Sequence, residues 1–201
     1  PGPEAQVAAI ADDIAYNNHD IDDGLRAELF SLDDLRHLAY VGEFLDPLRD
    51  RYPNIERSRL IHELVRRLIN GMVTDVHEVS AKRIAELAPK NVEDIRNAKK
   101  PVVGFSSKMS ETESELKEFL SERLYRHPSV TRLREDANQI VTELFQRMLE
   151  EPSEMPREWQ TRVSSPGSAA TARIVADYIA GMTDRYAIDE YARIFKKKIL
   201  K

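Results

Sequence analysis

Apolar residues recur at helical spacing along nearly the whole chain, and this periodicity is the strongest constraint on its fold. The clearest run begins at Ser58, and its apolar positions are three and four residues apart, as one buried face of a helix requires. They are Leu60, Ile61, Leu64, Val65, Leu68, Ile69, Met72 and Val73. Alternating β-branched stretches are almost absent, and Pro101-Val-Val is the nearest approach to a strand. The pattern predicts an all-α, multi-helix fold with residues 1–201 as one helical unit.

Capping residues and prolines set the helix boundaries that we expect in the first half. A first helix runs from about Glu4 to Asn18, because the turn-prone residues 17–24 favour an end there. Ser31-Leu-Asp-Asp34 has the form of a capping box and opens a short helix through Tyr40 or beyond.

Prolines and capping residues divide the rest of the chain in the same way. Pro47 and Pro53 interrupt the chain, and the long run from Ser58 reaches about Leu87 before Pro89 stops it. The composition of residues 97–109 favours a mobile loop. The further helices that we expect run from the Ser110–Glu113 capping box to about Tyr125, over Thr131–Glu150, over Ala169–Ala180, and from Thr183 onward after a left-handed Gly181.

Composition narrows the class of protein. There are 35 acidic and 30 basic residues, so the net charge of −5 gives no global field for nucleic acid and leaves only a local basic site possible. The absence of cysteine removes disulfides and thiolate ligands, so any metal must be held by His, Asp, Glu or water. No apolar run reaches the roughly 20 residues that span a bilayer. We therefore expect a cytoplasmic protein without a membrane partner.

Asp12, Tyr16 and Asp20 form the most distinctive polar pattern in the chain. Steps of four residues keep side chains on one face of a helix, and this face is flanked by small and apolar residues. Carboxylates in such surroundings are costly unless a cation or a hydrogen-bonding ligand meets them. Two other interpretations remain open: a polar helix face in water, and acidity at residues 17–24 that serves only to end the helix.

Two long motifs stand out in the sequence. The first is Asp12-Asp-Ile-Ala-Tyr16 followed by His19-Asp20-Ile-Asp-Asp-Gly-Leu, and the second is Asp177–Ala187. Together they resemble the deoxyguanosine triphosphate triphosphohydrolases of bacteria, which belong to the HD-domain superfamily. Arg57–Arg67, with Met72-Val-Thr-Asp75, and Leu124-Tyr-Arg-His127 stand in the order and approximate spacing of that family. The similarity covers almost the whole chain and implies an HD-superfamily-type helical domain.

The resemblance implies hydrolysis of dGTP or a related deoxynucleoside triphosphate to the deoxynucleoside and tripolyphosphate. Asp12 looks like the last ligand of a divalent metal, Mg²⁺ or Mn²⁺, which would polarise the α-phosphate and activate water. Tyr16 and Asp20 look like substrate residues beside the deoxyribose, and Arg59 or Arg57 is the candidate for the phosphates. An exposed basic start of a helix is the alternative for the arginines. Homo-oligomerisation is also implied.

The chain departs from the family pattern because no segment matches the first His or the His-Asp pair of the metal site. His19-Asp20 is a His-Asp dipeptide, but it follows Tyr16 and belongs to the pocket segment. The other four histidines show no pairing at the four-residue step of two ligands on one helix face. We therefore expect a C-terminal portion of such a hydrolase with no catalytic residue of its own and no activity alone. The alternative is a non-catalytic helical module for nucleotide binding or oligomerisation.

Overall fold

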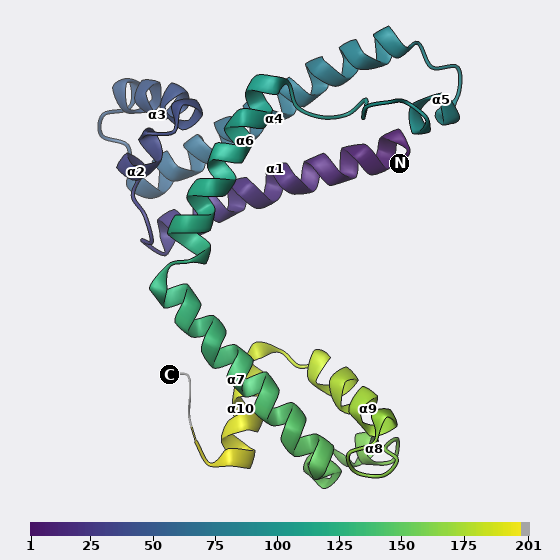
Figure 1. Cartoon of the computed structure of the whole chain (residues 1–201). Coiled ribbons are helices and arrows are strands. Elements are labelled where there is room, and N and C mark those ends of the chain that lie inside the picture. Colours follow the sequence, from purple (N-terminus) through teal and green to yellow (C-terminus); the bar gives the residue numbers. More distant parts are fainter. Residues whose placement is uncertain (198–201) are drawn as a thin grey trace. The chain divides into compact units, whose positions relative to one another are not determined.

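The computed structural model describes residues 1–197, in which all regular secondary structure is helical and no strand occurs (Figure 1). This confirms the all-α fold. The described chain forms two compact units, Pro1–His127 and the unit that begins at Pro128, where the sequence led us to expect one. None of the helices within residues 1–197 is both long and apolar enough to cross a membrane.

The first unit contains six helices and a terminal π-helical turn. They are α1 (Pro3–Arg26), α2 (Leu32–Arg36), α3 (Ala39–Arg51), α4 (Arg57–Leu87), α5 (Val92–Arg96), α6 (Ser107–Leu120) and η1 (Ser121–Tyr125). Helix α1 lies beside α4 and runs in the opposite direction (Figure 1). The Asn18 amide is 3.3 Å from the Met72 sulfur, and the Arg57 guanidinium donates to the Leu25 carbonyl at 2.7 Å. These contacts fix the register of the pair.

Helix α1 continues eight residues beyond the predicted end at Asn18, to Arg26, so that prediction was wrong. Ile21 and Leu25 are fully buried, and burial of each such side chain stabilises by about 1.5–3 kcal/mol. An unfavourable helix residue costs only about 0.5–1 kcal/mol. The Asn18 amide also donates to the Ile14 carbonyl at 2.8 Å. Core packing therefore outweighs the local turn preference.

The boundaries of α2, α3 and α6 also depend on both local sequence signals and core packing. The Ser31 capping box is present, but α2 ends at Arg36 and α3 starts anew. Pro47 lies inside α3, contrary to expectation, because burial of Leu45 and Leu48 on either side holds that helix together. Helix α6 is capped by Ser106, whose hydroxyl accepts from Met109, so the predicted cap at Ser110 was wrong.

The segment expected to be a mobile loop is free of helix between α5 and α6 but contains buried apolar residues. Val102, Val103 and Phe105 are at most 8% exposed. The Gln6 side chain accepts from the Val102 and Val103 amides at 2.9 and 3.1 Å. Asp75 accepts from the Ser106 amide at 2.8 Å. These contacts attach the segment to α1 and α4.

The second unit has its own core. Its elements are α7 (Pro128–Glu150), η2 (Pro152–Glu154), α8 (Arg157–Gln160), α9 (Ala169–Ala180) and α10 (Asp184–Phe195). Helix α9 has the predicted bounds, and Thr183 caps α10 as predicted. Gly181 has φ −83°, so its predicted left-handed conformation was wrong. The Tyr191 hydroxyl donates to Glu143 at 2.6 Å, and burial raises the pKa of Tyr191 to about 12.

Gly24 leaves space for an aromatic ring inside helix α1. A Cβ at this position would lie 2.3 Å from the Phe30 ring. Helix propensity alone would make Gly24→Ala stabilising by about 1 kcal/mol. Overpacking costs about 1–3 kcal/mol, so we expect a net destabilisation of up to about 2 kcal/mol in urea unfolding followed by circular dichroism.

Gly181→Ala is the matched control for this experiment. Its new Cβ meets nothing closer than 3.5 Å, and its φ suits any residue. We expect its free energy of unfolding to stay within about 0.5 kcal/mol of the parent value. A Gly24→Ala variant more stable than the parent would show that the Phe30 ring moves aside at no cost.

Candidate functional site

Asp12, Tyr16 and Asp20 lie on one strip of α1 that faces away from the core. Asp12 is exposed, the Tyr16 side chain is 58% exposed and Asp20 is half-buried. Ile14 and Ile21, on the opposite face of α1, are buried in the core. The structure thus places the three predicted residues on one helix face, within reach of a ligand or of water.

Tyr125 is a residue of this strip that sequence analysis did not assign. Its hydroxyl donates to the Asp20 carboxylate, and it also hydrogen-bonds with Tyr16. Burial, followed by these hydrogen bonds, raises the pKa of Tyr125 well above its usual range. Two segments far apart in sequence therefore meet at Asp20.

The π-helical turn η1 at the end of α6 leads to Tyr125. In this turn the backbone departs from the α-helical pattern, and the Arg126 amide donates to the Ser121 carbonyl at 3.1 Å. Such turns widen the helix by one residue and redirect the side chains that follow. The Leu124–His127 motif was a signal in the sequence, but nothing in its composition indicated either the turn or the contact with Asp20.

Lys117 of α6 is a cation beside the same strip. Its ammonium group is 3.4 Å from the Asp13 carboxylate and also pairs with Glu113, which raises the pKa of Lys117. Asp12 makes no ion pair or side-chain hydrogen bond within residues 1–197. Of the two neighbouring carboxylates, Asp12 is therefore the more available to a ligand.

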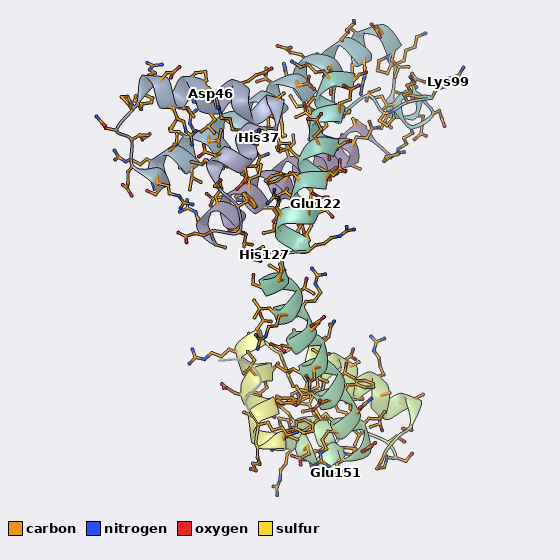
Figure 2. All side chains as sticks on the ribbon, turned by 60° about the vertical axis from the view of Figure 1, so that its left-hand side comes forward. His37, Asp46, Lys99, Glu122, His127 and Glu151 are labelled. Atoms are coloured by element: carbon orange, nitrogen blue, oxygen red, sulfur yellow. The ribbon has the colours of Figure 1, made fainter. Side chains whose placement is uncertain are left out.

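The described residues do not by themselves form a metal centre. Within residues 1–197, no three His, Asp or Glu side chains gather closely enough to hold an ion. His37 directly follows α2, whereas His127 lies between η1 and α7 (Figure 2). His19 borders a small apolar cavity of about 250 Å³ with Ile69, while Asp20 meets Tyr125, so the two side chains of the His-Asp dipeptide have different neighbours. Asp12 offers one oxygen ligand.

Arg59 lies at the opposite end of the helix pair from Asp12. Asn18 of α1 contacts Met72 of α4. Measured from this contact along the helix pair, Asp12 lies on one side and Arg59 on the other. At about 1.5 Å per residue, the spans Arg59–Met72 and Asp12–Asn18 add to roughly 30 Å. Arg57 donates to the Leu25 carbonyl and so caps the end of α1. Within one copy of the chain, neither arginine lies beside Asp12.

Comparison with known proteins agrees with the motifs. Residues 103–193 match the phosphohydrolase-associated domain family. The deoxyguanosinetriphosphate triphosphohydrolase-like protein of Parvibaculum lavamentivorans is 51% identical over 194 residues, which are 96% of this chain and 49% of that protein. Proteins of the same name from Rhizobium meliloti and Brucella ovis are 46% and 50% identical over 96% of this chain and 48% of each relative.

The matches extend over nearly the whole chain but over only part of each relative. The similarity runs through both compact units of the chain, and it includes the strip on α1 and the Leu124–His127 segment that meets it. The chain spans about half the length of the curated relatives that it matches. By sequence, the chain is therefore similar to about half of each deoxyguanosinetriphosphate triphosphohydrolase-like protein, and its residues 103–193 match the phosphohydrolase-associated domain.

Proposed function

We propose that this chain forms part of a metal-dependent hydrolase that converts dGTP or a related deoxynucleoside triphosphate to the deoxynucleoside and tripolyphosphate. The contact between Tyr125 and Asp20 supports this most directly, because it joins two family motifs at one solvent-facing strip. The relatives, 46–51% identical, are named deoxyguanosinetriphosphate triphosphohydrolase-like. The proposed substrate is taken from that name and from the chemistry of the strip.

Asp12 has the proposed role of one metal ligand. A carboxylate is a hard oxygen donor suited to Mg²⁺ or Mn²⁺, and Asp12 is exposed and without a partner in the described part of the chain. One carboxylate does not hold a catalytic ion, so the remaining ligands have to come from outside residues 1–197. On this proposal the chain alone is inactive.

Tyr16 and Asp20 have the proposed role of binding the sugar. The exposed Tyr16 ring offers a flat apolar surface to the deoxyribose and leaves no room for a 2′-hydroxyl. The Asp20 carboxylate, held by the Tyr125 hydroxyl, can accept a hydrogen bond from a sugar hydroxyl. Tyr125 is then a positioning residue, because it touches Asp20 and not the substrate.

Asp12→Ala tests the metal-ligand role in a protein extended to the full length of its relatives. We expect tripolyphosphate release from dGTP in the presence of Mn²⁺ to fall at least about a hundredfold, since loss of a first ligand disables the ion more than loss of a supporting residue, which costs about 10–100-fold. Asp13→Ala, which removes the carboxylate beside Lys117, is the matched control and should keep most activity. Equal activity of Asp12→Ala and the parent would refute the role.

Tyr125→Phe tests the positioning of Asp20. Loss of a hydrogen bond to a charged group costs about 1.5 kcal/mol, so we expect kcat/KM for dGTP to fall roughly tenfold. Tyr186→Phe removes the Tyr178–Tyr186 hydrogen bond in the second unit and should leave kcat/KM unchanged. The same loss in both variants would mean that Tyr125 acts only through stability.

The raised pKa of Tyr125 gives a second measurement that does not depend on activity. The folded state keeps this proton above pH 10, where the unfolded state loses it, so the contribution to stability is complete below pH 10 and declines above it. We expect Tyr125→Phe to reduce the fall in unfolding free energy above pH 10, measured by urea titration. An unchanged pH dependence would contradict a raised pKa of Tyr125.

A further inference from the structure

The small apolar cavity that His19 borders is a groove between α1 and α4. Its volume is about 250 Å³, and every residue that lines it is apolar except His19. Both helices contribute, among other residues, Val7, Ala11, Ala15, Ile69 and Val73. Val7 and Val73 are 52% and 51% exposed, although each belongs to a long helix that packs in the core. Within residues 1–197 this α1–α4 groove is therefore open to water.

The apolar surface continues beyond the groove along α4. Ile84 and Leu87 lie about three and four helical turns after Val73, so they return to nearly the same side of the helix, and each is 38% exposed. Helices α3 and α6 pack against α4 and α1, but neither contributes a residue to the groove. Grouped exposed apolar residues mark interaction surfaces in soluble proteins. This face of the helix pair therefore fits an apolar partner.

The charge of α1 disfavours a second copy of this chain as that partner. Helix α1 contains Glu4 and five aspartates, and Arg26 is its only lysine or arginine. A symmetric dimer across the groove would bring two such helices together, and like charges at short range repel one another. A different segment, with apolar side chains toward the groove and few acidic ones, fits this face better.

The length of the relatives indicates where such a segment comes from. The relatives that this chain matches are about twice as long as the matched region, so about half of each has no counterpart in this chain. Two parts of one protein that pack together bury apolar surface between them. The α1–α4 groove is an exposed apolar surface of this kind in the described chain.

A segment in the groove would lie directly beside Asp12. Residues three and four apart are neighbours on a helix surface, with Cβ atoms about 5–6 Å apart. Ala15 lines the groove and is three residues from Asp12. Because alanine is small, a segment that contacts Ala15 also comes close to the Asp12 carboxylate.

We propose that the α1–α4 groove is the docking site for the part of the longer relatives that has no counterpart in this chain. The docked part is held by apolar side chains that cover Val7 and Val73. Its position beside Asp12 allows it to supply further ligands to a metal ion there, and this consequence rests on the proposed function.

Val73→Cys reports whether the groove is covered. The chain has no cysteine, so the new thiol is the only one in it. We expect N-ethylmaleimide to label this thiol rapidly in the 201-residue chain. In a protein extended to the full length of its relatives, labelling should be at least about tenfold slower, because a covered thiol reacts only when the interface opens. Mass spectrometry of the labelled peptide separates this thiol from any cysteine in the extension.

Ala85→Cys is the matched control. Ala85 is exposed on α4, and the helical period turns its side chain about 120° away from that of Val73. Its thiol should react at the same rate in the short and the extended protein. Rapid labelling of Val73→Cys in the extended protein, or equal protection of the two thiols, would overturn the proposal.

A dilution series of the 201-residue Val73→Cys chain tests for a second copy in the groove. We expect its labelling rate to be independent of protein concentration. Protection that grows with concentration, together with a dimer in analytical ultracentrifugation, would replace the proposal with an interface between copies of this chain.

Val73→Gln tests the apolar contact without a label. In the 201-residue chain the new amide stays in water, so we expect an unchanged thermal unfolding midpoint. In the extended protein the same amide is buried against apolar groups, so the midpoint should fall by about 2 °C or more. An unchanged midpoint in the extended protein would contradict the docking.

These measurements need neither metal nor nucleotide, so they separate the docking site from the proposed hydrolysis. A protected Val73→Cys thiol in an extended protein that releases no tripolyphosphate would refute the hydrolysis and leave the docking site in place. A freely reactive thiol in an extended protein that hydrolyses dGTP would refute the docking site alone.

Discussion

The antiparallel packing of α1 on α4 is the interaction on which the first unit depends. Ile14, Ile21 and Leu25 of α1 and Leu64, Leu68 and Met72 of α4 belong to one core, and each is at most 5% exposed. Burial of that face of α1 obliges the opposite face to point outward, because the side chains follow the helical period. Asp12, Tyr16 and Asp20 therefore point outward because the residues on the opposite face of α1 are buried against α4.

Long amphipathic elements were predictable from the sequence, whereas local stop signals were not decisive. Helix α4 begins one residue from its predicted start and ends where predicted, because its apolar stripe is long and Pro89 follows it. Asn17, Asn18 and Gly24 suggested an end to α1, but their turn preference is worth less than the burial of Ile21 and Leu25. Pro47 in α3 shows the same balance.

In the candidate site, too, the sequence predicts features that depend on local helix geometry and does not predict those that depend on tertiary contacts. That Asp12, Tyr16 and Asp20 share a face follows from local geometry and needs only the helical period. The contact of Tyr125 with Asp20 joins residues more than a hundred positions apart and requires the π-helical turn, so periodicity does not reveal it. The position of Arg59 depends on the direction in which α4 packs on α1. Because the two helices are antiparallel, the start of α4 lies far from Asp12.

The separation of the two charged regions bears on how a nucleotide would meet this chain. The strip on α1 carries carboxylates, whereas Arg57 and Arg59 lie at the start of α4, and the antiparallel packing of the two helices keeps these arginines away from Asp12. A triphosphate at Asp12 is therefore out of reach of Arg59 in the same copy of the chain. Lys117, 3.4 Å from the Asp13 carboxylate, is a cation beside the Asp12 end of the strip. Phosphate contacts near Asp12 would accordingly rely on α6, or on groups outside this chain, more than on the start of α4.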